Sequence, residues 1–285
     1  MVFFTACHQQ VEPPKQSVCL EITPSAVKLP SASLKIGSQT GYPEEVTRSI
    51  NVEAFDIDAT EVTNAQFREF ISATGYVTTA ELPQPGSDTA GGAVFKSPTA
   101  SHPSWWHFIE GANWQHPEGP ESSIVGRDND PVVQVSLVDA RAYAKWAGRA
   151  VPTEGQWEYA ASAGRQSKYV WGDERAPNGE EQANTWQGTF PVQNTLADGF
   201  ALRAPIGCYA PNNFGLYDMI GNVWEWTKTP YEQIRIPNSY TIKGGSYLCA
   251  ENFCARYRAP ARQSQEIDFS TNHIGFRTVS KPVES

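Results

Sequence analysis

The chain has 285 residues, of which 40% are hydrophobic and 19% charged, so it has the composition of a folded protein with a buried core rather than a disordered one. Its formal net charge of -9 argues against nucleic acid as a partner, because phosphates bind basic surfaces, and favours a cationic peptide. No apolar run approaches the ~20 residues of a membrane-spanning helix.

The first segment, residues 1–30, is predicted to be a tail and tether, since it is polar and proline-containing. Its beginning, MVFFTAC, resembles the end of a bacterial lipoprotein signal with Cys7 as the acylated residue, although the apolar part is too short for a working signal as it stands. An extracytoplasmic lipoprotein and a cytoplasmic protein with an ordinary N-terminus both remain open. Residues 31–285 show no repeat or second linker and are predicted to form one domain, with regular structure starting near residue 35.

Three helices are predicted from start and stop signals, and one strand precedes the first of them. The strand covers residues 49–58, with an irregularity at Ala54, where the alternation of apolar and polar residues breaks. The helices cover residues 63–75, 136–148 and 153–164, and each begins at a serine or threonine that can cap its first turn.

Beyond about residue 165 the periodicity is poor, and short aromatic strands alternate with glycine, asparagine and proline turns. The predicted fold class is therefore α+β, with a few helices packed on small twisted sheets and much irregular chain. Irregular loops of this length in a compact domain are usually functional or stabilised by metal.

Cys249 and Cys254 are the strongest candidates for chemistry, because they lie close together between a Gly-Gly turn and several arginines. In one continuous strand they would point to opposite faces, so a turn at residues 250–252 must bring them together. A converged pair can form a plain disulfide, or its thiolates can bind a soft ion such as Cu(I). Nearby guanidinium groups can stabilise a thiolate or make ordinary surface salt bridges, and they belong to Arg256, Arg258 and Arg262.

Two other groups of residues carry weaker signals. Asn184 with Asp198, and Asp218 with Glu225, lie in turn-rich segments, where oxygen ligands and bent backbone suit Ca²⁺ but Asx turns are an equal explanation. Three histidines lie close together at a spacing that matches no established zinc pattern and favours buried or edge histidines among tryptophans: His102, His107 and His116. The sequence contains no phosphate-binding loop, dinucleotide-binding glycine pattern or nucleophile elbow.

A series of motifs across roughly residues 35 to 280 carries a family resemblance: EVTNAQFREF, WWHFIEGANWQHPEGP, PVVQVSLVDARAYAKWAG, VPTEGQWEYAA, ANTWQGTFPVQNT, DGF, APNNFGLYDMIGNVWEW, KGGSYLC, CARYR and GFR. On these motifs the chain resembles the formylglycine-generating enzymes, also called sulfatase-modifying factors. GNVWEW and GFR also occur in non-catalytic relatives of the fold, whereas the cysteine pair and GANWQHPEGP point to the catalytic branch. The resemblance implies a variant of the C-type lectin fold, with little regular secondary structure and bound calcium.

For activity, the resemblance implies an oxidase that converts a cysteine in a sulfatase C-x-P-x-R motif to Cα-formylglycine with O2 as co-substrate. Cys249 and Cys254 would be the Cu(I) ligands, and the substrate thiolate would join them. Ser246 and Trp224 match positions that line the oxygen-side pocket in the family. The partner would be an unfolded or nascent sulfatase peptide, whose arginine suits the acidic chain, and a monomer is the default expectation.

The resemblance also implies two calcium ions, each bound by two side chains and two backbone oxygens. The first set would be Asn184 and Asp198 with the backbone of Thr185 and Phe200. The second set would be Asp218 and Glu225 with the backbone of Gly221 and Val223. Family members often have asparagine where this chain has Asp218, and a carboxylate there should still bind calcium.

The structural disulfides of the vertebrate members are expected to be absent, because Ala144 and Ala259 stand at two of the equivalent positions. That fits a bacterial enzyme that relies on packing and calcium, and Cys208 is predicted to be a buried small residue. The alternative function is a non-catalytic, lectin-like binding protein of the same fold, whose cysteine pair would be a disulfide or a coincidence. A related iron-dependent sulfoxide synthase is disfavoured, because no suitable histidine ligand set is present.

Overall fold

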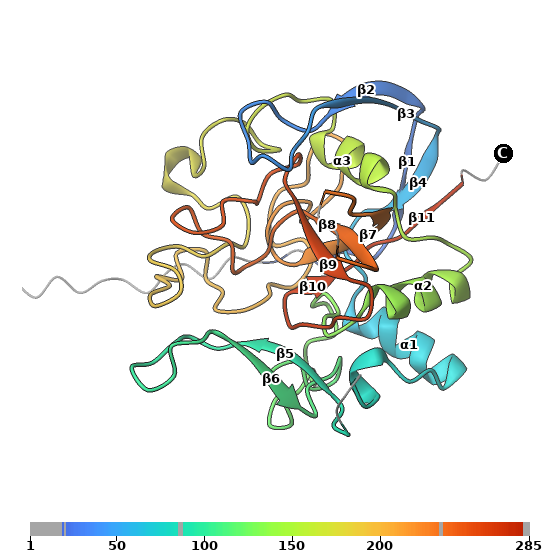
Figure 1. The fold of residues 1–285 in the computed structure, drawn as a ribbon. Helices are drawn as coiled ribbons and strands as arrows, with labels where there is room; N and C mark the ends of the chain where they lie inside the picture. Colours follow the sequence, from blue (N-terminus) through green and yellow to red (C-terminus); the bar gives the residue numbers. More distant parts are fainter. Residues whose placement is uncertain (1–18, 20, 85–87, 234–235, 282–285) are drawn as a thin grey trace, which may run out of the picture.

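Four small β-sheets carry the fold in the computed structural model, which describes residue 19 and residues 21–84, 88–233 and 236–281 (Figure 1). The central sheet has the order β10-β7-β8-β9 and consists of Ile274–Gly275, Trp224–Pro230, Ser239–Lys243 and Arg262–Glu266. A second sheet, β1-β4-β11, consists of Ala26–Leu29, Phe55–Asp58 and Val279–Ser280. The other two sheets are the antiparallel pairs of β2 with β3 and β5 with β6, formed by Ala32–Ile36, Arg48–Val52, Gly91–Phe95 and Trp106–Glu110.

Each of the three predicted helices is confirmed. They are α1, α2 and α3, at Asn64–Thr74, Leu137–Trp146 and Glu154–Ser162, and two single 3-10 turns, η1 and η2, lie at Thr79–Glu81 and Pro177–Gly179. Each α-helix starts at its predicted cap because a complete capping box forms there, which satisfies backbone N–H groups that the first turn leaves unpaired. Within the described ranges, no helix combines the length and apolar character needed to cross a membrane.

The single strand predicted over residues 49–58 is two strands in different sheets. β3 pairs with β2, whereas β4 pairs with β1 and β11. The break falls at Glu53 and Ala54, next to the predicted irregularity. Val52 and Phe55 are both buried although they are three positions apart, so one continuous alternating strand cannot hold both in a core.

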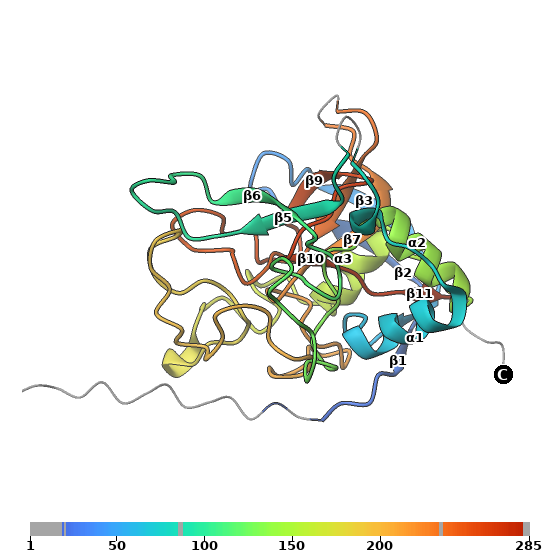
Figure 2. The same ribbon diagram turned by 90° about the horizontal axis from the view of Figure 1, so that it is seen from below.

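Three buried clusters hold these elements together and place the cysteines. The largest lies between α1, α2 and the central sheet, and includes Phe67, Tyr143, Trp226 and Cys249. A second surrounds Trp157 of α3, and a smaller third cluster lies under the loops around residues 186–190 and 247–250. In Figure 2 the β5–β6 hairpin projects on the side away from α1 and α2. The predicted α+β class with little regular structure is confirmed.

The segment predicted as a tail contains regular structure at its end, which corrects the boundary at residue 30. Strand β1 pairs antiparallel with β4, and the Ser25 carbonyl accepts a hydrogen bond from the Ala59 N–H at 2.8 Å. Strand β4, with which β1 pairs, lies about 30 positions further along the chain, so no local sequence pattern predicted the pairing. Cys7 lies outside the described residues, and the lipoprotein prediction is therefore not tested.

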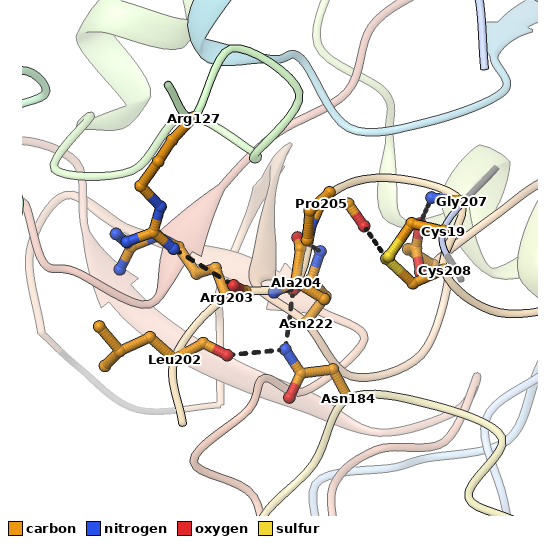
Figure 3. The surroundings of a disulfide bond; sticks show 11 residues. Cys19, Arg127, Asn184, Leu202, Arg203, Ala204, Pro205, Gly207, Cys208 and Asn222 are labelled. Carbon is orange, nitrogen blue, oxygen red and sulfur yellow. Dashed lines mark hydrogen bonds between the residues drawn. A yellow bond between two sulfur atoms is a disulfide. The ribbon is translucent and has the colours of Figure 1, made fainter. Parts of the chain in front are cut away.

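The prediction that Cys208 is a buried small residue is wrong. Cys208 is half-buried and forms a disulfide with Cys19, across a sequence separation of 189 residues (Figure 3). Packing accompanies the bond, because a Cβ added to Gly207 would lie 2.0 Å from the Cδ1 atom of Ile22. The N-terminal segment is therefore fixed to the loop that contains Gly207 and Cys208.

Candidate active site

The cysteine pair lies on a turn that follows strand β8. Cys254 donates its backbone N–H to the carbonyl of Ala250 at 3.0 Å, which closes the turn predicted at residues 250–252. The two sulfur atoms lie 3.6 Å apart, and both thiols are free. Gly245 permits the approach of the next segment, since a Cβ at this position would lie 2.9 Å from the Cα of Tyr257. The structure thus brings the two cysteines together without a disulfide bond between them. Their spacing in the sequence had left such a bond open as an alternative.

The two thiols differ in environment. Cys249 is 1% exposed, and burial, with Cys254 beside it, raises its pKa well above the usual range. For Cys254, the hydrogen bond from Cys249 and then the neighbouring Arg256 lower the pKa to about 6. The Nη1 atom of Arg256 is 3.9 Å from the Cys254 sulfur. Cys254 is therefore the more acidic thiol of the pair, and Cys249 the less acidic one.

Ser246 and Trp224, the other two predicted site residues, are both buried. The backbone N–H of Ser246 points at the Cys249 sulfur at 3.4 Å, and the Ser246 hydroxyl accepts the N–H of Leu248 at 3.3 Å. Trp224 begins β7 and belongs to the same buried cluster as Cys249. The structure therefore places Ser246 in direct contact with the pair and Trp224 in the hydrophobic cluster that also contains Cys249.

The first predicted calcium set is only partly brought together around Asp198, because the Thr185 carbonyl, one of its expected ligands, accepts a hydrogen bond from Gln187. The Asp198 carboxylate accepts backbone N–H groups from Thr185 at 3.2 Å and Phe200 at 3.0 Å. Burial raises the pKa of Asp198 to about 6. Asn184 donates its amide N–H to the Leu202 carbonyl, and its own Oδ1 is buried without a hydrogen-bond partner (Figure 3). An unpartnered buried oxygen on Asn184, the residue before one that contacts the Asp198 carboxylate, fits an oxygen-binding cation such as Ca²⁺.

The second predicted set is only partly arranged as expected. Asp218 is buried, accepts the Gly207 N–H at 2.8 Å, and has its pKa raised by burial to about 6. Glu225 is committed elsewhere, because its two oxygens accept hydrogen bonds from Arg277 and from the indole N–H of Trp157, each at 2.8 Å. Gly221 and Val223 lie on the buried turn between these two carboxylates. Asp218 therefore fits a cation better than Glu225 does.

Glu61 is a third carboxylate at this place, and sequence reasoning missed it. Burial, and then the negative charge of Asp218, raise the pKa of Glu61 well above its usual range. Its Oε1 accepts a hydrogen bond from Asn222, and its Oε2 is buried without a partner. Because Arg277 is bound to Glu225, buried negative charge here exceeds positive charge, which also fits a cation. Among the described residues no three His, Cys, Asp or Glu side chains converge as a metal cluster, so backbone oxygens would have to complete either site.

One family model matches nearly the whole chain. It is the sulfatase-modifying factor enzyme 1-like domain, and it covers residues 11–282. The chain belongs to this family. The predicted resemblance to the sulfatase-modifying factors is thereby confirmed, and the match begins within the segment that was predicted to be a tail.

Individual relatives make the likeness within the family more specific. A protein named formylglycine-generating enzyme, from Mycobacterium tuberculosis, is 47% identical over 90% of this chain and 98% of its own length. A protein named inactive C-alpha-formylglycine-generating enzyme 2, from Bos taurus, is 36% identical over 90% of this chain and 88% of its own. The solved structure of PvdO from Pseudomonas aeruginosa has a TM-score of 0.65 at 21% identity, covers 95% of this chain and all of that one, and supports the fold alone. Because one relative is named inactive, an activity has to be argued from the site as well.

Aromatic side chains form a cluster around Phe253, the residue that precedes Cys254 in the chain. The Phe253 ring is 54% exposed and stacks on Phe190 with ring centroids 4.7 Å apart. Trp105 packs edge-on against both rings, at 5.7 and 5.9 Å. Only the adjacent tryptophans in the sequence hinted at this cluster, because its members lie in three separate segments.

The three neighbouring histidines do not form a zinc site. The ring of His102 lies 3.1 Å from the Ser101 hydroxyl, that of His107 3.0 Å from the Ser104 carbonyl, and that of His116 2.6 Å from the Ser122 carbonyl. Each ring thus hydrogen-bonds to a serine in its own segment, with His102 exposed and the other two partly buried. A fourth histidine, His273, is partly buried and lies 4.8 Å from the Trp106 ring, measured between ring centroids.

Proposed function

We propose that this protein is a copper-dependent, sulfatase-activating oxidase, which converts the cysteine of a C-x-P-x-R motif to Cα-formylglycine with O2 as co-substrate. The observation that carries the proposal is the pair of free thiols with sulfurs 3.6 Å apart, at the positions that the motifs assign to copper. Similarity to a protein named formylglycine-generating enzyme over 90% of the chain supports the same activity. A lectin-like binding protein would leave the reduced, converged pair without a role.

The pair fits Cu(I) by the chemistry of its donors. Cu(I) is a soft ion that binds few thiolate ligands, and two sulfurs that already face each other need little rearrangement to share one. When bound, copper would supply a site for the substrate thiolate and the one-electron chemistry that O2 requires. The resident residues prepare this site: Cys254 offers a thiolate, and burial of Cys249 and Ser246 keeps bulk water from the inner side of the pair.

The substrate in this proposal is an extended, unfolded sulfatase segment rather than a folded surface. The exposed Phe253 ring beside Cys254 offers an apolar contact for the residues around the target cysteine, including its proline. The net charge of -9 favours the arginine of the motif. The enzyme is proposed to act on this segment as a monomer.

A synthetic C-x-P-x-R peptide tests the proposal. Incubation with the Cu(I)-loaded protein in air, with a thiol as reductant, should give a peptide in which the thiol-bearing carbon has become an aldehyde. Mass spectrometry detects this change, and an aldehyde-reactive hydroxylamine probe confirms it. A peptide with serine in place of the target cysteine is the control and should not react. Tight copper binding without any conversion of the cysteine peptide would show that this substrate class is wrong.

Calcium is proposed to bind at Asn184 and Asp198, and a second ion at Asp218 with Glu61 beside it. Removal of calcium by a chelator should then lower the melting temperature by about 5–10 °C, because a bound ion stabilises only the folded state. Differential scanning calorimetry with and without added calcium measures the shift. Asn184→Ala should reduce it, whereas Asp128→Asn, which changes an exposed carboxylate paired with Arg68, should not. An unchanged melting temperature in the unmodified protein would contradict both sites.

The disulfide between Cys19 and Cys208 supports an extracytoplasmic location, because such bonds persist mainly in oxidising compartments. The proposed location agrees with the lipoprotein interpretation of Cys7, which remains a prediction. Cys249 and Cys254 are free thiols in the same molecule, which distinguishes this pair from the disulfide-bonded pair of Cys19 and Cys208.

A further inference from the structure

The loop between β2 and β3 lies against the segment that follows Cys254. We name residues 37–46 of this loop the brace loop. The backbone N–H of Ala255 donates to the Tyr42 hydroxyl at 3.1 Å. Glu44 accepts two hydrogen bonds from Arg256 through one carboxylate oxygen, from Nε at 2.8 Å and Nη2 at 2.6 Å. These contacts join positions more than 200 residues apart, so the loop packs against the cysteine turn through tertiary contacts.

The guanidinium group of Arg256 connects the brace loop to the cysteine pair. The Nε and Nη2 atoms of Arg256 face Glu44, its face lies 3.9 Å from the Tyr42 ring centroid, and its Nη1 is 3.9 Å from the Cys254 sulfur. A guanidinium is rigid and planar, so fixing one edge and one face also fixes the remaining nitrogen. The side chains of Arg256 and Glu44 are only 24% and 17% exposed, which limits the screening that weakens surface ion pairs.

The brace loop is itself held by different residues. Glu45, adjacent to Glu44, has a fully buried side chain that pairs with Arg258. Gly37 donates its N–H to a carboxylate oxygen of Glu158 at 2.6 Å, and its φ of 84° brings the loop ends together. Anchoring of the loop and contact with Arg256 are therefore carried by separate side chains, which can be changed separately.

We propose that Tyr42 and Glu44 are positioning residues for the cysteine pair: they hold the Arg256 guanidinium against the Cys254 sulfur and keep that sulfur directed at Cys249. The role of the pair in substrate oxidation rests on the proposed function, but the positioning does not. Glu44 is the carboxylate that pairs with Arg256 among the described residues, and without it the long arginine side chain regains rotational freedom, so the contact with sulfur is lost for most of the time.

The test is the rate at which iodoacetamide alkylates Cys254 in the metal-free protein with the pair reduced, followed by mass spectrometry at one fixed pH. Glu44→Ala and Arg256→Met are each expected to slow alkylation by about tenfold, because a charge-assisted contact to the attacking sulfur is lost. The double variant should be no slower than Arg256→Met alone, because Glu44 acts through Arg256. Additive effects, or an unchanged or faster rate in Glu44→Ala, would overturn the proposal.

Two further variants separate positioning from loss of structure. Glu45→Gln loosens the loop anchor, and should lower the melting temperature more than Glu44→Ala does while slowing alkylation less. If alkylation instead follows thermal stability across the variants, the role of Glu44 is merely structural and the proposal fails. Tyr42→Phe keeps the ring beneath Arg256 and removes the hydroxyl, so it should slow alkylation only a few-fold.

Turnover of the peptide gives an independent readout. If the proposed function is correct, Glu44→Ala should lower kcat with little change in KM, because Arg256 acts on the sulfur and not on peptide binding. A rise in KM alone would contradict positioning. If the unmodified protein never converts the peptide, but the variants differ in alkylation rate as expected, the proposed function is wrong and the positioning role still holds.

Discussion

Cys254→Ser is expected to reduce conversion of the C-x-P-x-R peptide by more than about 100-fold. This loss is larger than that usually caused by mutating a residue that only hydrogen-bonds to a metal ligand. Serine is a poor ligand for Cu(I), and its hydroxyl is not ionised at neutral pH. The melting temperature should change little, because Cys254 is only partly buried and takes part in no cross-link. Mass spectrometry of the peptide and circular dichroism of the variant measure the two effects.

Cys249→Ser should cause the same loss of conversion, with a greater cost in stability, since this side chain is 1% exposed within the main core. The two serine variants also distinguish a reactive pair from a structural one. If either variant loses about 2–4 kcal/mol in unfolding free energy while peptide conversion persists, the pair is a structural disulfide in solution. That result would remove the copper proposal.

Cys19→Ser is expected to behave in the opposite way, with a loss of about 2–4 kcal/mol in unfolding free energy and unchanged peptide conversion. The Cys19–Cys208 bond spans 189 positions, so it restricts the unfolded chain strongly and fixes the N-terminal segment on the loop at Gly207. Urea unfolding followed by tryptophan fluorescence measures the change.

Cys208→Ser is the matched control for the disulfide. Both single variants break the same bond, so each should lose the same free energy, and the double variant should lose no more. An unchanged midpoint in all three would mean that the bond contributes nothing to stability. The proposed compartment can be tested by alkylating thiols at the moment of cell lysis and then measuring the intact mass. Alkylation of all four of Cys19, Cys208, Cys249 and Cys254 would indicate a reducing compartment.

Local signals in the sequence predicted the helices well, for a reason visible in the structure. The cap and the residue three positions later satisfy each other's backbone groups, so the capping boxes at Thr63, Ser136 and Thr153 need no tertiary partner. The strand over residues 49–58 was predicted less well. Local alternation marked the break, but membership in two sheets depends on partners elsewhere in the chain.

The candidate site divides in the same way. The cysteine turn closes through contacts within a few residues, so the convergence of Cys249 and Cys254 was open to prediction from spacing. The burial of Glu61 beside Asp218, and the pairing of Glu225 with Arg277, were not open to it, because these residues come from distant segments. Which carboxylates are left to bind a cation is decided by that packing.

The sequence by itself determined the helix positions, the family and the position of the candidate cysteine pair, because these depend on motifs and on interactions over a few positions. Only the tertiary structure decided that Cys19 joins Cys208, that Glu44 holds Arg256 and that β1 belongs to the domain. Each of these contacts links residues far apart in the chain. No local pattern encodes them, since the partner is selected by how the whole core packs and not by the neighbouring residues.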